Sequence, residues 1–254
     1  MTLPPDAGAA RATARRAEMS PKRKARLAGA LLLCTIVAGG FAQGYGEASF
    51  IVAGDAAATA SRIMAQAPLY RLVFAVYLVE MACQIAMTVL YYELLRPVSK
   101  SAAMLAATFG LIGCIIKTLS RLFFFAPLLV LNGAGYLGVF DATQLPAIAY
   151  LSLRLNYTAE TMAMVFFGLH SLMWGYLVLR STFLPRALGA LSLVGGCGWL
   201  MYLYEPLAHR LQAVIVGTGV IGALVSVTWL LVYGVNEQRW REQDAASRQS
   251  TYLP

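Results

Sequence analysis

The chain has 254 residues, of which 59% are hydrophobic and 13% are charged, compared with about 45–50% and about 25% in ordinary soluble domains. Apolar stretches of about eighteen residues or more recur along it, and each is long enough to cross a hydrocarbon core of about 30 Å. This composition excludes an ordinary soluble domain, and the net charge of +8 does not indicate a nucleic-acid partner, because Lys and Arg in short loops between membrane spans set topology.

The N-terminal part of the chain combines a basic tail with a first apolar stretch. Residues 1–26 form a polar, Arg-rich tail, and Leu27–Ala42 is the first predicted span. A cleaved signal peptide is the alternative, because Gly40–Ala42 is an acceptable cleavage site, but the long basic region before it favours a retained helix. A polar loop, Gly44–Pro68, follows, and within it Asp55 is predicted to cap a short helix that ends at Gln66.

Five further spans are predicted beyond this loop, at Leu69–Leu94, Ser101–Leu131, Ala159–Leu179, Ala187–Tyr204 and Leu211–Tyr233. A second short helix is predicted outside the membrane at Ala142–Arg154, because proline at position 146 is tolerated near the start of a helix. Glu205 is expected to open a short loop. The prediction is therefore an all-α membrane domain over residues 27–235, with six spans and two short outer helices, followed by a polar tail over residues 236–254.

The distribution of basic residues predicts the orientation of the chain. Fourteen Lys and Arg residues fall in the two tails and the loops on their side of the membrane, whereas four fall in the opposite segments. Loops rich in Lys and Arg stay in the cytoplasm. We therefore expect both termini on the cytoplasmic face of a bacterial cytoplasmic membrane.

Ionisable residues inside the predicted spans are the strongest candidates for a functional site, because charges at membrane depth are costly unless they are paired or functional. Glu80 lies in the second span, and Gln84 follows one turn later on the same face. Lys117 and Arg121 lie one turn apart in the third span. The two helices are antiparallel, and the depths of Glu80 and Lys117 differ by only about 8 Å, so we expect the two side chains to meet.

Glu160, at the outer end of the fourth span, is predicted to meet Arg121 in the same layer, with Asn156 close by. One interpretation is structural: a buried ion pair fixes the register of the helices, and Arg121 extends to the outer interface. The other is functional: these residues line a polar cavity that opens outward and binds a lipid head group or another amphipathic small molecule. The sequence leaves both open.

His170 lies in the middle of the fourth span and is expected to be a neutral, hydrogen-bonding residue. Bis-histidine haem would need a second histidine within the membrane, but His209 lies in an outer loop. Zinc would need a cluster of ligands that the sequence does not offer. We therefore predict neither a cofactor nor a metal site.

Several short segments together resemble an uncharacterised bacterial family of integral membrane proteins, domain of unknown function 4386. The matching segments are Ser20–Gly29, Gly54–Thr59, Tyr92–Val98, Val165–Leu169, Phe183–Gly189 and Trp229–Val235. They extend over the chain from about residue 20 to residue 235. The resemblance implies a multi-pass helical membrane fold and no known activity.

Three hypotheses for function remain open. The protein binds a lipid or amphipathic small molecule in an outward-facing polar cavity; or it is a membrane-embedded enzyme acting on a lipid or isoprenoid; or it is a purely structural or partner-binding membrane protein. In the enzyme, by chemical analogy with membrane terpene cyclases, Glu80 would be the acid or base. Lys117 and Arg121 would hold an anionic head group, and His170 would relay a proton. The sequence does not define the oligomeric state.

Overall fold

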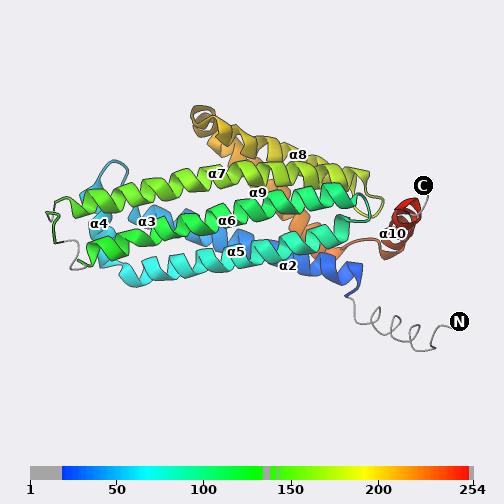
Figure 1. Cartoon of the computed structure of the whole chain (residues 1–254), viewed down its shortest axis with the longest axis horizontal. Helices are drawn as coiled ribbons and strands as arrows, with labels where there is room; N and C mark the ends of the chain where they lie inside the picture. Colours follow the sequence, from blue (N-terminus) through cyan, green and yellow to red (C-terminus); the bar gives the residue numbers. More distant parts are fainter. Residues whose placement is uncertain (1–18, 134–137, 142, 252–254) are drawn as a thin grey trace, which may run out of the picture.

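A computed structural model of the chain describes residues 19–133, 138–141 and 143–251. All regular secondary structure in these residues is helical, and among them six helices are long and apolar enough to cross a membrane. The prediction of an all-α protein with six spans is confirmed. The long helices run side by side, with α4 (Ala56–Ala65) at one end of the bundle and α10 (Glu237–Thr251) at the other (Figure 1). We call the end that carries α4 the far end and the end that carries α10 the near end.

The first span is longer than predicted. It begins as α2 (Pro21–Gly39), widens into a π-helix, η1 (Gly40–Glu47), and ends in α3 (Ala48–Phe50). The predicted end at Ala42 and the loop from Gly44 are therefore wrong. Glycine-rich sequence disfavours an α-helix, but in lipid every backbone group needs a partner, so the helix widens instead of stopping.

Of the next four helices, three match their predictions and one differs. Asp55 caps α4 as expected, accepting a hydrogen bond from the backbone of Ala58 at 2.8 Å. The second span is α5 (Ala67–Leu95) and the third is α6 (Lys100–Leu131), both within two residues of the predicted bounds. The fourth span, α7 (Leu145–Arg180), begins well before its predicted start at Ala159.

The predicted short helix over residues 142–154 and the fourth span form one helix of 36 residues, which is about 54 Å long. Ala142 lies outside the described residues, and Pro146 occupies the first turn of α7. The polar residues between the two predicted helices suggested a break there. Instead Asn156 is buried, and the helix stays intact because its polar side chains find partners on α6.

The last spans form a hairpin that returns to the near end. They are α8 (Arg186–Leu200), extended by the short 3-10 helix η3 (Met201–Leu203), and α9 (Glu205–Val232). Glu205 begins α9 and does not open a loop, as had been predicted. After α9, Trp240 of α10 anchors that helix to the bundle, because its indole nitrogen donates to the carbonyl of Leu94 at 2.8 Å.

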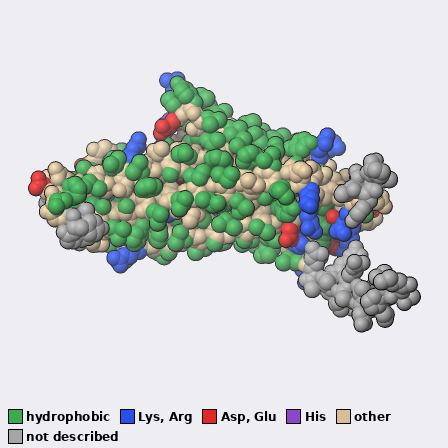
Figure 2. Space-filling model, in the orientation of Figure 1, with side chains coloured by type: hydrophobic (Ala, Val, Ile, Leu, Met, Phe, Trp, Pro, Cys, Tyr) green, Lys and Arg blue, Asp and Glu red, His purple; other side chains and the backbone are tan. Residues whose placement is uncertain are grey.

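The six spans form a closed ring in chain order. Each packs against the next, from α2 and α5 to α8 and α9, and α9 packs against α2. Glycines bring α7 and α8 together: a Cβ on Gly175 would lie 2.8 Å from the carbonyl oxygen of Gly189. Small residues of this kind allow close helix packing in membranes. On the face shown in Figure 2, hydrophobic side chains cover most of the length of the bundle, as a lipid-facing surface requires.

Two apolar clusters fill the ring. The near-end cluster includes Tyr91, Leu94, Trp174, Leu177 and Leu188. The far-end cluster includes Phe50, Ile63, Tyr70, Phe124 and Leu128. Between them, α5, α6 and α7 carry the buried charged side chains.

Candidate functional site

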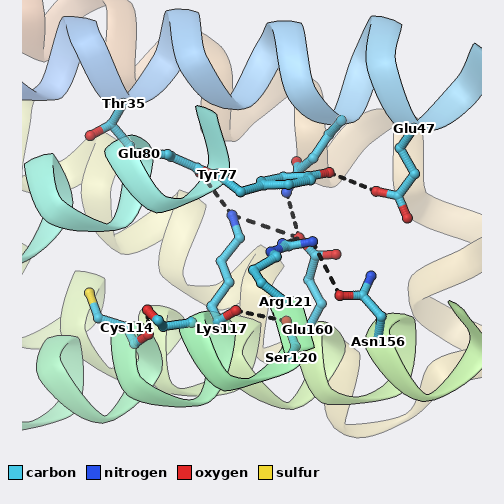
Figure 3. A network of polar contacts seen from close by, with 12 residues as sticks. Thr35, Glu47, Tyr77, Glu80, Cys114, Lys117, Ser120, Arg121, Asn156 and Glu160 are labelled. Atoms are coloured by element: carbon cyan, nitrogen blue, oxygen red, sulfur yellow. Dashed lines mark hydrogen bonds and ion pairs between the residues drawn. The ribbon is translucent and has the colours of Figure 1, made fainter. Parts of the chain in front are cut away.

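Five charged side chains from four helical segments meet in one polar network, seen from close by in Figure 3. The members are Glu47 of η1, Glu80 of α5, Lys117 and Arg121 of α6, and Glu160 of α7. Glu80 lies 16 residues from Arg96, and Glu160 lies 20 residues from Arg180. At about 1.5 Å per residue these separations are about 24 Å and about 30 Å. The network therefore lies toward the far end of the membrane-spanning part.

Lys117 and Glu80 form the first ion pair of the network, as their depths had predicted. The Lys117 ammonium donates to the Glu80 carboxylate at 2.8 Å, and both residues are 4% exposed. The first span lies directly against this pair, since a Cβ on Gly39 would lie 3.0 Å from Glu80 Oε1. A glycine at this position thus leaves room for the carboxylate.

Arg121 and Glu160 form the second ion pair, with Nη2 and Oε1 separated by 2.7 Å. Arg121 also donates to Asn156 Oδ1 at 3.3 Å, and its guanidinium stacks 3.6 Å from the centre of the Tyr77 ring. Its side chain is fully buried. Arg121 therefore does not extend to the outer interface, contrary to that part of the structural interpretation. Lys117 lies 3.7 Å from Glu160, which joins the two pairs.

Three further members of the network were not predicted from the sequence. Tyr77 donates through its hydroxyl to Glu47 at 2.7 Å, and the amide of Gln43 donates to Glu160. Glu47 was assigned to the polar loop and Gln43 to no element, because the first span was expected to stop at Ala42. The available signal was their spacing of four residues, which places them on one face if the helix continues.

Three buried atoms of the network have no hydrogen-bond partner among the described residues: Glu80 Oε2, Arg121 Nε and Asn156 Nδ2. The first is an acceptor and the other two are donors. Buried polar atoms are nearly always paired in folded proteins, because an unpaired one costs about 1–3 kcal/mol. Of the four unpartnered buried side-chain atoms in the described chain, three are therefore concentrated in this one network.

His170 does not reach the network. Its Nδ1 donates to the carbonyl of Ala106 at 2.8 Å, and Ala106 lies 11 residues from Lys117, which is about 16 Å along α6. His170 instead lines a small cavity near the near-end cluster with Thr88 and Trp174. The Trp174 indole nitrogen is the fourth unpartnered atom. The cavity is lined mainly by apolar side chains and is separate from the charged network.

Gln84, one turn from Glu80, is partly buried, and its backbone carbonyl accepts from Thr88. In the described chain its side chain has no hydrogen bond to the network.

Among the described residues no group of three or more His, Cys, Asp or Glu side chains could hold a metal ion. Two of the free cysteines, Cys34 of α2 and Cys83 of α5, lie with their sulfur atoms 3.4 Å apart.

Comparison with known proteins places the chain in a family. The family model described as Domain of unknown function (DUF4386) matches residues 27–234, and the chain belongs to this family. An uncharacterized protein of Archaeoglobus fulgidus is 29% identical over 153 residues, which cover 59% of this chain and 76% of that one. No solved structure matches the chain. The family resemblance is thereby confirmed, and it assigns no activity.

Proposed function

We propose that the protein binds the polar head of a lipid or amphipathic small molecule at the charged network. The observation that carries this proposal is the set of three unpartnered atoms on Glu80, Arg121 and Asn156. A network that served only to hold helices together would be expected to pair all its members, because a partly satisfied buried network is less stable than an apolar core. A bound head group with both donors and acceptors would pair these atoms.

The exposure of the network supports entry of such a ligand from the side of η1. Gln43 is exposed, and Glu47 and Glu160 are partly buried, whereas Arg121 and Asn156 are fully buried. The buried atoms thus lie behind a rim of accessible polar groups. An apolar tail would remain among the lipid chains along the hydrophobic outer face of the bundle.

The proposal includes an orientation. Lys and Arg side chains gather around the near end in the view of Figure 2, which favours that end as the cytoplasmic one of a bacterial cytoplasmic membrane. The network would then lie in the outer half of the bilayer and take its ligand from the outer leaflet.

The enzyme hypothesis has less support from the geometry. It required His170 to relay a proton for Glu80, yet His170 donates to Ala106 well below the network. Glu80 Oε1 is held by Lys117, so only Oε2 is left to contact a substrate. The purely structural hypothesis remains the competing outcome of the test.

The test is native mass spectrometry of the protein purified from its own membrane. Asn156→Leu removes an unpartnered donor at similar volume, and Thr158→Val, at an exposed position on the same helix, is the matched control. We expect a specific small molecule or lipid on the wild type and the control, and none on Asn156→Leu. Identical bulk lipid on all three would refute the proposal.

A second variant guards against misfolding of Asn156→Leu. Gln43→Met changes only the exposed rim of the network, where its amide contacts Glu160. It is expected to fold normally and to retain the ligand more weakly than the wild type. Unchanged retention in Gln43→Met would argue against entry beside η1.

A further inference from the structure

The charged network contains more negative than positive groups. Its described members are three carboxylates, on Glu47, Glu80 and Glu160, and two cations, on Lys117 and Arg121. Each cation is held by a carboxylate at 2.7–2.8 Å. If all five groups are ionised, the network carries one uncompensated negative charge.

Glu47 is the group left without a cation. Its Oε2 accepts from the Tyr77 hydroxyl at 2.7 Å, and no ion pair of Glu47 is formed with the residues that the structure describes. A carboxylate within the membrane that lacks a counter-charge is costly, so such groups pair with a cation or take up a proton. The hydroxyl of a neutral tyrosine supplies a hydrogen bond but no compensating charge.

The buried part of the network offers a second uncommitted acceptor. Glu80 Oε2 has no partner although its residue is only 4% exposed. The two cations, by contrast, have no surplus charge to offer, because Glu80 and Glu160 already neutralise them. This arrangement disfavours the anionic head group that sequence analysis had assigned to Lys117 and Arg121.

We propose that the site selects an amphiphile whose head carries a protonated amine beside a hydrogen-bond acceptor such as a hydroxyl, and that Glu47 is the counter-charge of the amine. The proposal rests on the proposed function of the same network. The N–H groups of the ammonium donate to Glu47, the acceptor takes the unpartnered N–H groups of Arg121 and Asn156, and the charge of the amine brings the network to neutrality. On the same π-helix Phe41 and Tyr45 stack with ring centroids 5.9 Å apart, and such ring faces attract ammonium groups.

The test compares three probes with the same twelve-carbon tail: dodecylamine, dodecanol and dodecanoate. Binding to the full chain in lipid nanodiscs is measured at neutral pH, below the concentration at which the probes form micelles. We expect dodecylamine to bind about tenfold more tightly than dodecanol, and dodecanoate to bind most weakly. Glu47→Gln should remove the preference for the amine over dodecanol.

Two variants control for folding and for general surface charge. Glu47→Asp keeps the negative charge and should keep the preference for the amine. Glu205→Gln removes an exposed carboxylate at the start of α9, which pairs only with His209 among the described residues, and should leave the preference intact. A preference for the amine that persists in Glu47→Gln would overturn the role of Glu47.

The other outcomes separate this inference from the proposed function. If the three probes bind equally and Asn156→Leu abolishes all binding, the site exists but does not select a cation, and Glu47 carries a proton instead. Tightest binding of dodecanoate would likewise overturn the inference. If no probe binds to the wild type, the proposed function itself fails.

Discussion

At the far end of the membrane-spanning part, α5, α6 and α7 meet through ion pairs and hydrogen bonds, whereas toward the near end α7 and α8 meet through glycines. The far contact depends on side chains that reach across the ring, such as Lys117 to Glu80 at 2.8 Å. The near contact depends on their absence, because Gly175 faces the carbonyl of Gly189 with no room for a Cβ.

The two contacts should therefore fail in opposite ways. Removing one member of a buried ion pair leaves its partner charged and unpaired, so the far contact is sensitive to loss of a group. Adding a methyl group to a close helix contact forces the backbones apart, so the near contact is sensitive to the addition of a side chain at its glycines. Each of the following variants tests one side of this comparison.

The largest effect is expected for Lys117→Met, which leaves Glu80 unpaired and removes a cation from Glu160. We expect a loss of about 3–5 kcal/mol in the free energy of unfolding, measured by denaturation in detergent micelles. The double variant Glu80→Gln with Lys117→Met should recover most of this loss. Lys100→Met, at an exposed position at the start of α6, is the control, and a double variant no more stable than Lys117→Met would contradict a paired role.

A smaller loss of stability is expected for Gly175→Ala. Its Cβ would lie 2.8 Å from the Gly189 carbonyl oxygen, and relieving such overpacking typically costs about 1–3 kcal/mol. Gly217→Ala, in α9 where nothing lies within 4 Å of the added Cβ, is the matched control and should be neutral or slightly stabilising. Equal melting temperatures for the two variants would mean that α7 and α8 are not in close contact.

Tyr77→Phe should have a modest effect, about 1 kcal/mol. It removes the hydrogen bond to Glu47 but keeps the ring that stacks on Arg121. Tyr77→Leu should be less stable than Tyr77→Phe because it also removes this stacking. Thermal unfolding of both variants, each alone and with Glu47→Gln, separates the two contributions. Strict additivity between Tyr77→Phe and Glu47→Gln would show that the charge of Glu47 does not strengthen its hydrogen bond with the hydroxyl.

The smallest effect on stability is expected from linking Cys34 to Cys83. Their sulfur atoms lie 3.4 Å apart, and a disulfide needs about 2.05 Å, so a small approach of α2 and α5 suffices. Oxidation with copper phenanthroline should join the two helices, as peptide mapping under non-reducing conditions would detect. Cys34→Ser is the control. Failure to form this link would contradict the packing of α2 beside Glu80.

The pairing of charges could be predicted because span lengths determine depth. Once the second and third spans were placed, Glu80 and Lys117 fell within one or two turns of each other, and Glu160 fell in the layer of Arg121. The same reasoning failed for Glu47 because Gly44–Pro68 was interpreted as a polar loop outside the first span. In lipid the backbone has no water to bond with, so η1 continues the first span to the network.

The helix boundaries at α7 and α9 show a second limit of sequence reasoning. Polar residues near Asn156 suggested a loop outside the membrane, but they face α6 and pair with Arg121. Glu205 suggested a loop and instead begins α9. Polarity alone does not distinguish a residue that faces water from one that faces a charged partner on the next helix.

The π-helical segment also sets the rotational phase of the first span. Successive residues of an α-helix are rotated by about 100°, whereas a π-helix bonds five residues ahead and rotates less per residue. Over the eight residues of η1 the difference accumulates, so Glu47 and Phe50 face directions that an uninterrupted α-helix would not give them. Deleting one residue from η1, such as Gly44, would let the segment close into an α-helix that still turns Glu47 toward Tyr77, whereas inserting one residue would turn Glu47 away.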